Sequence, residues 1–267
     1  MKEIIEKAVK IMASEPALLR LHGNIMVAGD THGDVIISRH IVDKFFDDRF
    51  DYLIFLGDYI DRAPPDVGSS LHNMNFLIET KVKHPKKIYL LKGNHEANYA
   101  IPCYPHDFEY EAGEMYMDYI KLFKEMPLAA MLNNVFASHG GILKELIDLD
   151  KNGLDKNDVK AIEMLTWSDP AIANLYRGAG VPFDENDLEK FLAMMNAEAF
   201  IRGHDYNMNG IIVYKKCLTI FSSRSYKDMG NKGILIAKIK GDIYAIDDIE
   251  IEDFYTGKWK KYRVRYI

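Results

Sequence analysis

The chain has 267 residues, of which 48% are apolar and 28% are charged, a composition that is ordinary for a soluble globular protein. Its net charge of −6 argues against a nucleic-acid partner, and no apolar stretch approaches the ~20 residues of a membrane-spanning helix, so no membrane partner is expected either. The two cysteines, Cys103 and Cys217, argue against a disulfide framework and predict a cytoplasmic protein.

The first half of the chain alternates between helical and strand patterns. Apolar residues at helical spacing predict an amphipathic helix over residues 1–20. Short apolar stretches predict strands at 24–28, 51–56 and 87–91, and the segments between them predict helices at 34–46 and 67–82. This alternation is typical of βαβ units around a largely parallel sheet.

The second half of the chain favours strands. Short strands are predicted at 135–138 and 199–202, and each ends in a histidine motif. Further strands, separated by tight turns, are predicted at 211–214, 218–221, 233–238 and 243–246, followed by a basic edge strand at 258–266. Together these patterns predict an α/β (α+β) fold with a central β-sandwich of two mixed sheets flanked by α-helices.

Six short motifs lie beside glycine or at the end of an apolar stretch. They are GDTHG (29–33), GDYIDR (57–62), GNHE (93–96), SHGG (138–141), WSDP (167–170) and RGH (202–204). The first three directly follow the first three predicted strands. Ligands of open α/β sheets bind beyond the carboxyl ends of the strands, so these three motifs are expected to converge on one edge.

The motifs supply oxygen and nitrogen donors without a cysteine, which suits hard or borderline divalent metals. The predicted ligands of a first metal ion are Asp30, His32 and Asp58. Those of a second ion are Asp58, which can bridge the two, with Asn94, His139 and His204. Manganese is the expected metal in vitro, and iron or zinc would also fit. Two such ions can hold a bridging water, lower its pKa and clamp the oxygens of a phosphoryl group.

Three more residues complete the predicted chemistry. The leaving alkoxide needs a proton, and His95, next to Asn94 in the sequence, is the natural general acid. Asp61 is expected to hydrogen-bond the other nitrogen of that ring, and Arg62 to bind the phosphate with its forked guanidinium. Histidines outside the motifs, among them His106, are interpreted as ordinary surface or core residues.

The motifs resemble those of the PPP superfamily of metal-dependent serine/threonine protein phosphatases, from about residue 24 to residue 247. The resemblance implies a calcineurin-like metallophosphoesterase fold with a dinuclear site at one end of the β-sandwich. It assigns Arg62 and Asn94 to the substrate phosphate and adds two residues that the pattern alone would not select. These are Arg177, as a second phosphate-binding arginine, and Tyr226, in a loop that overhangs the site.

The predicted function is therefore metal-dependent hydrolysis of phosphoserine and phosphothreonine in proteins, by direct attack of a metal-bridging hydroxide. Phosphorylated proteins or peptides would be the substrates, and no regulatory subunit is evident. Residues 1–267 are expected to form a single metallophosphoesterase catalytic domain. The compact chain suggests a prokaryotic or archaeal member of the family that acts alone.

Three alternative functions stay open. A bis(5′-nucleosyl)-tetraphosphatase shares the first four motifs, a more distant metallophosphoesterase such as a nuclease would cleave diesters, and a catalytically silent scaffold would only bind metal.

Residues 99–119, rich in tyrosine, methionine and acidic residues, are interpreted either as a substrate-facing insertion or as a covered helix. Residues 148–153 begin like a calcium-binding loop, but Val159 replaces the glutamate that such a loop needs, which indicates a surface turn.

Overall fold

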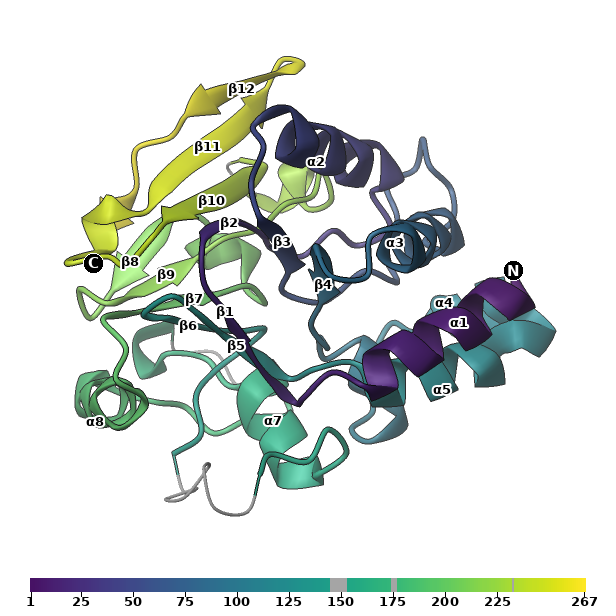
Figure 1. The fold of residues 1–267 in the computed structure, drawn as a ribbon, viewed down its shortest axis with the longest axis horizontal. Coiled ribbons are helices and arrows are strands. Elements are labelled where there is room, and N and C mark those ends of the chain that lie inside the picture. The colour runs from purple at the N-terminus through teal and green to yellow at the C-terminus, as the bar shows by residue number, and fades with distance from the viewer. Residues whose placement is uncertain (145–152, 174–176, 232) are drawn as a thin grey trace.

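The computed structural model describes residues 1–144, 153–173, 177–231 and 233–267. The surface turn expected at 148–153 lies outside these residues, apart from Gly153. Within them, two β-sheets pack face to face and helices cover their outer faces (Figure 1). None of the helices in the described residues has the length and apolar character needed to cross a membrane.

The first sheet has six strands in the order β12-β11-β10-β2-β3-β4. They are β2 (Asn24–Ala28), β3 (Tyr52–Phe55), β4 (Ile88–Leu90), β10 (Leu235–Lys240), β11 (Glu250–Tyr255) and β12 (Lys258–Lys261). β2, β3 and β4 are parallel, as the alternating pattern predicted, and β10 joins them antiparallel. The carboxyl ends of β2, β3 and β4 therefore lie along one edge, and each leads into one of the first three motifs.

The second sheet has seven strands in the order β1-β5-β6-β7-β9-β8-β13. They are β1 (Leu18–Leu21), β5 (Ala129–Leu132), β6 (Val135–Ser138), β7 (Ala199–Arg202), β8 (Ile211–Val213), β9 (Cys217–Thr219) and β13 (Arg265–Tyr266). β6, β7 and β9 are parallel, whereas β5 and β6 form an antiparallel hairpin. Parallel and antiparallel pairs thus occur in both sheets, as expected for the mixed sandwich.

The alternation of side chains along each strand builds the core. On β2, Ile25 and Val27 belong to the apolar layer between the sheets, whereas Met26 and Ala28 face the helices. An isolated bridge pairs Asp30, just beyond β2, with Phe221, just beyond β9. The two sheets therefore meet at the end where the motifs lie.

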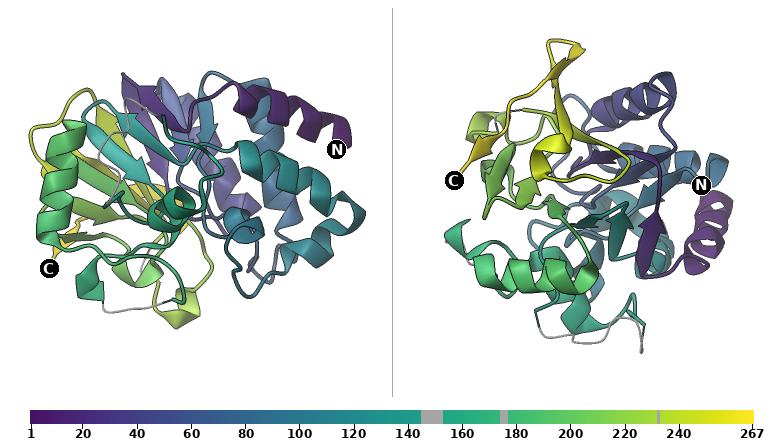
Figure 2. Two further views of the ribbon diagram at one scale, coloured as in Figure 1. Left: turned by 90° about the horizontal axis from the view of Figure 1, so that it is seen from below. Right: turned by 60° about the vertical axis from the view of Figure 1, so that its left-hand side comes forward.

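Helices cover both outer faces of the sandwich. The six-stranded sheet shares a core with α1 (Lys2–Ala13), α2 (Val35–Asp47), α3 (Leu71–Lys83), α4 (Phe108–Ala112) and α5 (Tyr116–Glu125). The seven-stranded sheet shares one with α7 (Val159–Trp167) and α8 (Glu185–Met195). In Figure 2 the purple N-terminal helix lies beside the teal helices, because α1 packs against α5.

Three predicted elements are wrong. The edge strand expected at 258–266 is instead two strands, β12 and β13, which lie at the edges of different sheets. The helix expected over residues 1–20 ends at Ala13, because Pro16 has no N–H for a continuing helix and Leu18–Leu21 pair with β5 as a strand. The strand expected at 243–246 is instead a loop leading into a short 3-10 helix, Ile246–Asp248. The carboxylate of Asp248 accepts the backbone N–H groups of Tyr244 and Ala245 there, and such local bonds replace those of a strand.

Candidate metal centre

Glycines in the motifs let two segments of backbone approach carboxylates closely. A methyl group added at Gly93 would lie 2.2 Å from Oδ1 of Asp58, and one added at Gly203 would lie 2.2 Å from Oδ1 of Asp30. Any larger residue at these positions would displace the two carboxylates. The glycines of GNHE and RGH are therefore required for the site to assemble.

Asp58 lies at the centre of the cluster. Its Oδ2 is 3.5 Å from Nε2 of His32, 3.4 Å from Nε2 of His139 and 4.0 Å from Nε2 of His95. Two groups of possible metal ligands share it: His32, Asp58 and His95 form one, and Asp30, Asp58 and His139 form the other, with donor atoms within 4.8 Å of one another in each. All five of these residues are buried.

The donor atoms fit divalent cations. Oδ1 of Asn94 lies 3.0 Å from Nε2 of His139, which in turn faces Oδ2 of Asp58. With the ring of His139 neutral at Nε2, three atoms that carry lone pairs converge, and a cation among them would make all three ligands. Without a cation, either the ring takes up a proton or the amide turns and donates from its nitrogen. Nδ1 of His139 is buried and has no hydrogen-bond partner within the described residues.

The electrostatics of the cluster favour added positive charge. Burial raises the pKa of Asp30 to about 7 and lowers that of His32 to about 3. Burial also opposes protonation of His139, but the carboxylates of Asp58 and Asp30 outweigh it and raise the pKa of that ring to about 9. Two buried carboxylates are thus close together, and divalent cations would compensate their charge.

His204 is close to the cluster but belongs to neither group of three. Its backbone N–H donates to Oδ1 of Asp30 at 3.0 Å, and its ring lies 5.2 Å from that of His139. Nδ1 of His204 is 3.2 Å from Oδ1 of Asp169, a carboxylate that also accepts from the buried Arg202. A carboxylate on the outer nitrogen of a ligating histidine fixes the ring and its tautomer.

His95 and Asp61 form the expected pair. Nδ1 of His95 lies 2.5 Å from Oδ2 of Asp61, and the backbone N–H of Phe108 donates to Oδ1 at 2.8 Å. Burial opposes ionisation of Asp61, but hydrogen bonds from His106 and His95 prevail and hold its pKa well below the ordinary value. His95 also belongs to the first ligand group, so it stands beside the proposed metal position.

Of the predicted phosphate-binding residues, Arg62 and Tyr226 contact each other, whereas Arg177 pairs with two carboxylates elsewhere in the site. Arg62 donates to the hydroxyl of Tyr226 and, at 3.1 Å, to the carbonyl of Tyr104. Tyr226 stacks on Tyr206 with ring centroids 4.5 Å apart, and its ring meets that of His32 edge-on, so it lies beside the cluster. Arg177 is 28% exposed, and its guanidinium pairs with Asp169 and Asp205 beside His204.

Four residues at the site had no predicted role. Glu96 accepts the backbone N–H groups of Asp58, Tyr59 and Gly93, and Asp169 orients His204. Both belong to the motifs, so position alone could have drawn attention to them. The others are Cys103, whose Sγ lies 3.4 Å from Nε2 of His95, and His106, which faces Asp61. No pattern in the sequence marks these two.

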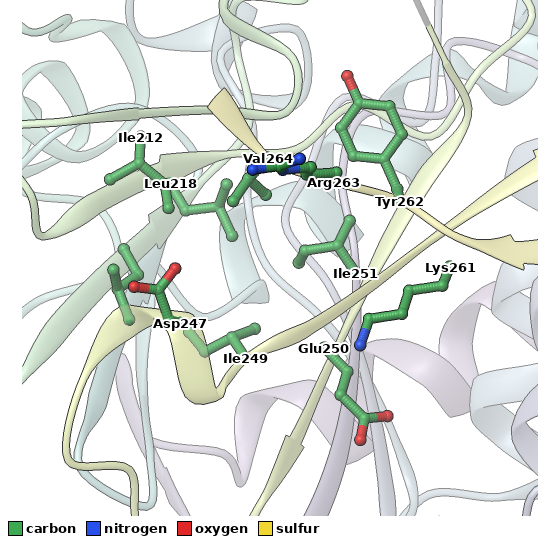
Figure 3. A pocket seen from close by; sticks show the side chains of 11 residues that line it. Ile212, Leu218, Asp247, Ile249, Glu250, Ile251, Lys261, Tyr262, Arg263 and Val264 are labelled. Atoms are coloured by element: carbon green, nitrogen blue, oxygen red, sulfur yellow. The ribbon is translucent and has the colours of Figure 1, made fainter. Parts of the chain in front are cut away.

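A pocket lies away from this cluster. It lies between β8, β9 and the C-terminal strands and has a volume of about 430 Å³. Ile212, Leu218, Ile251 and Tyr262 are among the residues that line it (Figure 3). It adjoins the N-terminal end of β11, whereas the cluster lies beyond the C-terminal end of β2, which runs in the same direction as β11. Among the described residues, its lining includes no histidine or cysteine.

The fold and the cluster define a metallophosphoesterase. The sequence model of the family described as calcineurin-like phosphoesterase matches residues 23–208, and the chain belongs to this family. The fold is also that of a solved protein serine/threonine phosphatase from Saccharomyces cerevisiae, with a TM-score of 0.76 at 22% identity, covering 98% of this chain and 89% of the other.

Curated relatives carry phosphatase names. The chain is 25% identical over 276 residues to a serine/threonine-protein phosphatase of Caenorhabditis elegans, covering 94% of this chain and 60% of the relative. It is 30% identical over 266 residues to serine/threonine-protein phosphatase T of Saccharomyces cerevisiae, covering 89% and 50%. It thus spans half to three fifths of their length. Both organisms are eukaryotes, so these relatives give the expected prokaryotic or archaeal origin no support.

Proposed function

We propose that the protein is a metal-dependent serine/threonine protein phosphatase that hydrolyses phosphomonoesters. The observation that carries the proposal is the position of Asp58, which is shared by two ligand groups and lies beside the His95–Asp61 pair. The names of the relatives support a phosphoprotein substrate. A single domain over residues 1–267 and a cytoplasmic location remain predictions.

The proposed metal ligands are those expected from the sequence. Asp30, His32 and Asp58 would hold one divalent ion, and Asp58, Asn94, His139 and His204 the other, with manganese, iron or zinc as candidates. When bound, the ions supply an activated water and neutralise charge on the transferred phosphoryl group. His204 is included because its outer nitrogen is held by Asp169, as is usual for a ligating histidine.

The side chains around the ions have separate roles in the proposed reaction. His95 gives a proton from Nε2 to the oxygen of the leaving serine or threonine, while Asp61 holds Nδ1 and stabilises the charged ring. Arg62, fixed by Tyr226 and the carbonyl of Tyr104, offers its guanidinium to the phosphoryl oxygens. Asn94 is proposed to contact them as well.

Arg177 is the proposed second phosphate contact. Two carboxylates, those of Asp169 and Asp205, hold its Nε and Nη2. We assign Nη1 to the phosphate, since the other two nitrogens already face carboxylates. The pairing would keep the guanidinium rigid and charged, which favours recognition of a phosphate dianion.

Turnover by the reconstituted enzyme tests the proposal. Protein stripped of metal and reloaded with manganese, iron or zinc alone should release phosphate from phosphoserine and phosphothreonine peptides. Diadenosine tetraphosphate is the competing substrate, and an Asp58→Asn variant is the inactive control because it disturbs both ligand groups. Cleavage of the dinucleotide with the peptides left intact would favour the tetraphosphatase, and a fully metallated protein without any turnover would leave only the scaffold.

A further inference from the structure

Asp61 faces two histidines, although the expected chemistry uses only one. His95 approaches Oδ2 of Asp61 with Nδ1 at 2.5 Å, and Nδ1 of His106 lies 3.4 Å from the same oxygen. His106 is 45 residues from Asp61 in the sequence and stands just before α4, whose first residue, Phe108, donates its N–H to the other carboxylate oxygen. Both oxygens of the carboxylate therefore have a hydrogen-bond partner.

His106 is itself held in a fixed orientation. Its Nε2 lies 2.8 Å from the hydroxyl of Tyr116, the first residue of α5, and its side chain is only 8% exposed. If the hydroxyl of Tyr116 donates to Nε2, the ring proton sits on Nδ1 and points at Asp61. The result is a hydrogen-bonded row that runs from Tyr116 through His106 and Asp61 to His95.

The segment that carries His106 touches the rest of the catalytic machinery too. Cys103 contacts Nε2 of His95, and the carbonyl of Tyr104 accepts from Arg62. Residues 103–108 thus form one wall beside the His95–Asp61 pair, which favours the interpretation of residues 99–119 as a substrate-facing insertion over that of a covered helix.

We propose that His106 is a positioning residue for the general acid: by donating Nδ1–H to Oδ2 of Asp61, it fixes the carboxylate that aims His95 at the leaving oxygen. The inference rests on the proposed function, because the orientation of His95 affects the rate only if His95 protonates the leaving group. Without this donor, the partners left to Asp61 among the described residues would be His95 and the N–H of Phe108, and its carboxylate could rotate. His95 would then spend less time in the orientation that delivers its proton.

The leaving group separates this role from a merely structural one. The alkoxide of serine is a poor leaving group and needs the proton, whereas p-nitrophenolate leaves without one. We expect His106→Phe, which keeps a ring but loses the donor, to lower kcat about tenfold on a phosphoserine peptide and less than twofold on p-nitrophenyl phosphate. His106→Asn, whose side-chain amide can donate from a similar position, should restore most of the activity on the peptide.

Three controls make the result decisive. His84→Phe removes another half-buried imidazole at the far end of α3 and should change neither rate. Tyr116→Phe removes only the outer partner and should give a weaker form of the same selective loss. In a His95→Asn background, His106→Phe should have no further effect on the peptide, because the donor acts through His95.

Two outcomes would overturn the proposal. One is an equal loss on both phosphate esters with metal content unchanged, and the other is a full additional loss in the His95→Asn background. If His106→Phe does not fold, His106→Asn and Tyr116→Phe supply the same comparison. Failure of the proposed function is distinct from either outcome, since the unmodified, metal-loaded enzyme would then leave the phosphoserine peptide intact.

Discussion

Six residues assigned to the site have positive φ angles, between 38° and 72°, in the left-handed region that side chains other than glycine rarely adopt. They are His32, Asp58, Asp61, Arg62, His204 and Tyr226. Each such residue costs of order 1–3 kcal/mol and persists only where the surrounding structure holds it. The turns after the strands therefore direct these side chains toward the cluster, and their backbone conformation lowers the local stability.

His95 gives the sharpest test at the scale of single residues. Replacing it with asparagine removes the proton donor while the Asp58, His32 and His139 donors stay in place. We expect kcat on a phosphoserine peptide to fall by roughly 10²–10⁴, the usual contribution of a general acid, with two metal ions still bound. Steady-state kinetics together with metal analysis would check this, and near-normal turnover on the peptide would refute the assignment.

Residue roles could be predicted from the sequence where chemistry and position coincide. His95 follows Asn94, and Asp61 follows Asp58 by three residues, so each stands in a motif whose strand end fixes its location. His106 could not be predicted, because it reaches Asp61 through an irregular segment that has no period and no motif. Arg177 emerged only from the resemblance to a family, since its two carboxylate partners come from separate parts of the chain.

At the scale of elements, Glu96 joins the turns that follow β3 and β4. Its buried carboxylate accepts the backbone N–H groups of Asp58 and Tyr59, both at 2.8 Å, and that of Gly93 at 3.0 Å. These bonds fix the two turns relative to each other, and with them Asp58 and Asn94. The position of Glu96 in the GNHE motif marks the residue, but its role as an acceptor for two turns has no sequence pattern of its own.

Glu96→Ala should destabilise the protein strongly. Three buried backbone N–H groups would lose their acceptor, and each unsatisfied group costs about 1–3 kcal/mol, so we expect the free energy of unfolding to fall by more than about 3 kcal/mol. Glu96→Gln keeps the shape but turns a donating amide toward N–H groups, and it should fall between wild type and alanine. Urea unfolding of the three proteins would decide, and an unchanged midpoint for the alanine variant would contradict the role.

The strands that lead into the motifs were predictable because each is an apolar stretch closed by a glycine turn. β2, β3 and β4 lie within a residue or two of the predicted segments. Two of the errors occurred where a local effect outweighed the apolar pattern: Pro16, which has no N–H, ended the first helix early, and hydrogen bonds to Asp248 drew residues 244 and 245 into a turn. Apolar spacing alone does not detect either effect.

At the scale of the whole molecule, two asparagines join the sheets at the end opposite the metal centre. Both lie in the turn between β5 and β6. Asn133 donates to the carbonyls of Gly23 and Gly241, and Asn134 exchanges two hydrogen bonds with the backbone of Ile243. Side-chain hydrogen bonds therefore join the two sheets at this end, whereas at the other end the sheets meet around the metal centre.

Asn134→Ala should weaken the fold without affecting catalysis. The N–H and the carbonyl of Ile243 would lose partners at 2.9 and 2.7 Å, so we expect the free energy of unfolding to fall by about 1–3 kcal/mol. Because Asn134 precedes β6 and His139 follows it, the length of the strand separates the change from the site. Unfolding and kcat measured on one preparation would test this, and a large loss of kcat with unchanged stability would contradict it.

Metal removal should act on the whole molecule, because the proposed ligands come from both sheets. Asp30, Asp58 and Asn94 follow strands of the six-stranded sheet, whereas His139 and His204 follow β6 and β7 of the other. Ions held between them would join the two sheets, and ions that bind only the folded state stabilise it by about 2.7 kcal/mol at a concentration of 100 times Kd. Chelation should therefore lower the melting temperature, and added manganese should restore it.

Asp58→Asn, which disturbs both ligand groups, is the control and should melt at nearly the same temperature with and without metal. A wild-type protein whose melting temperature ignores chelation would argue that no ion bridges the sheets at this site.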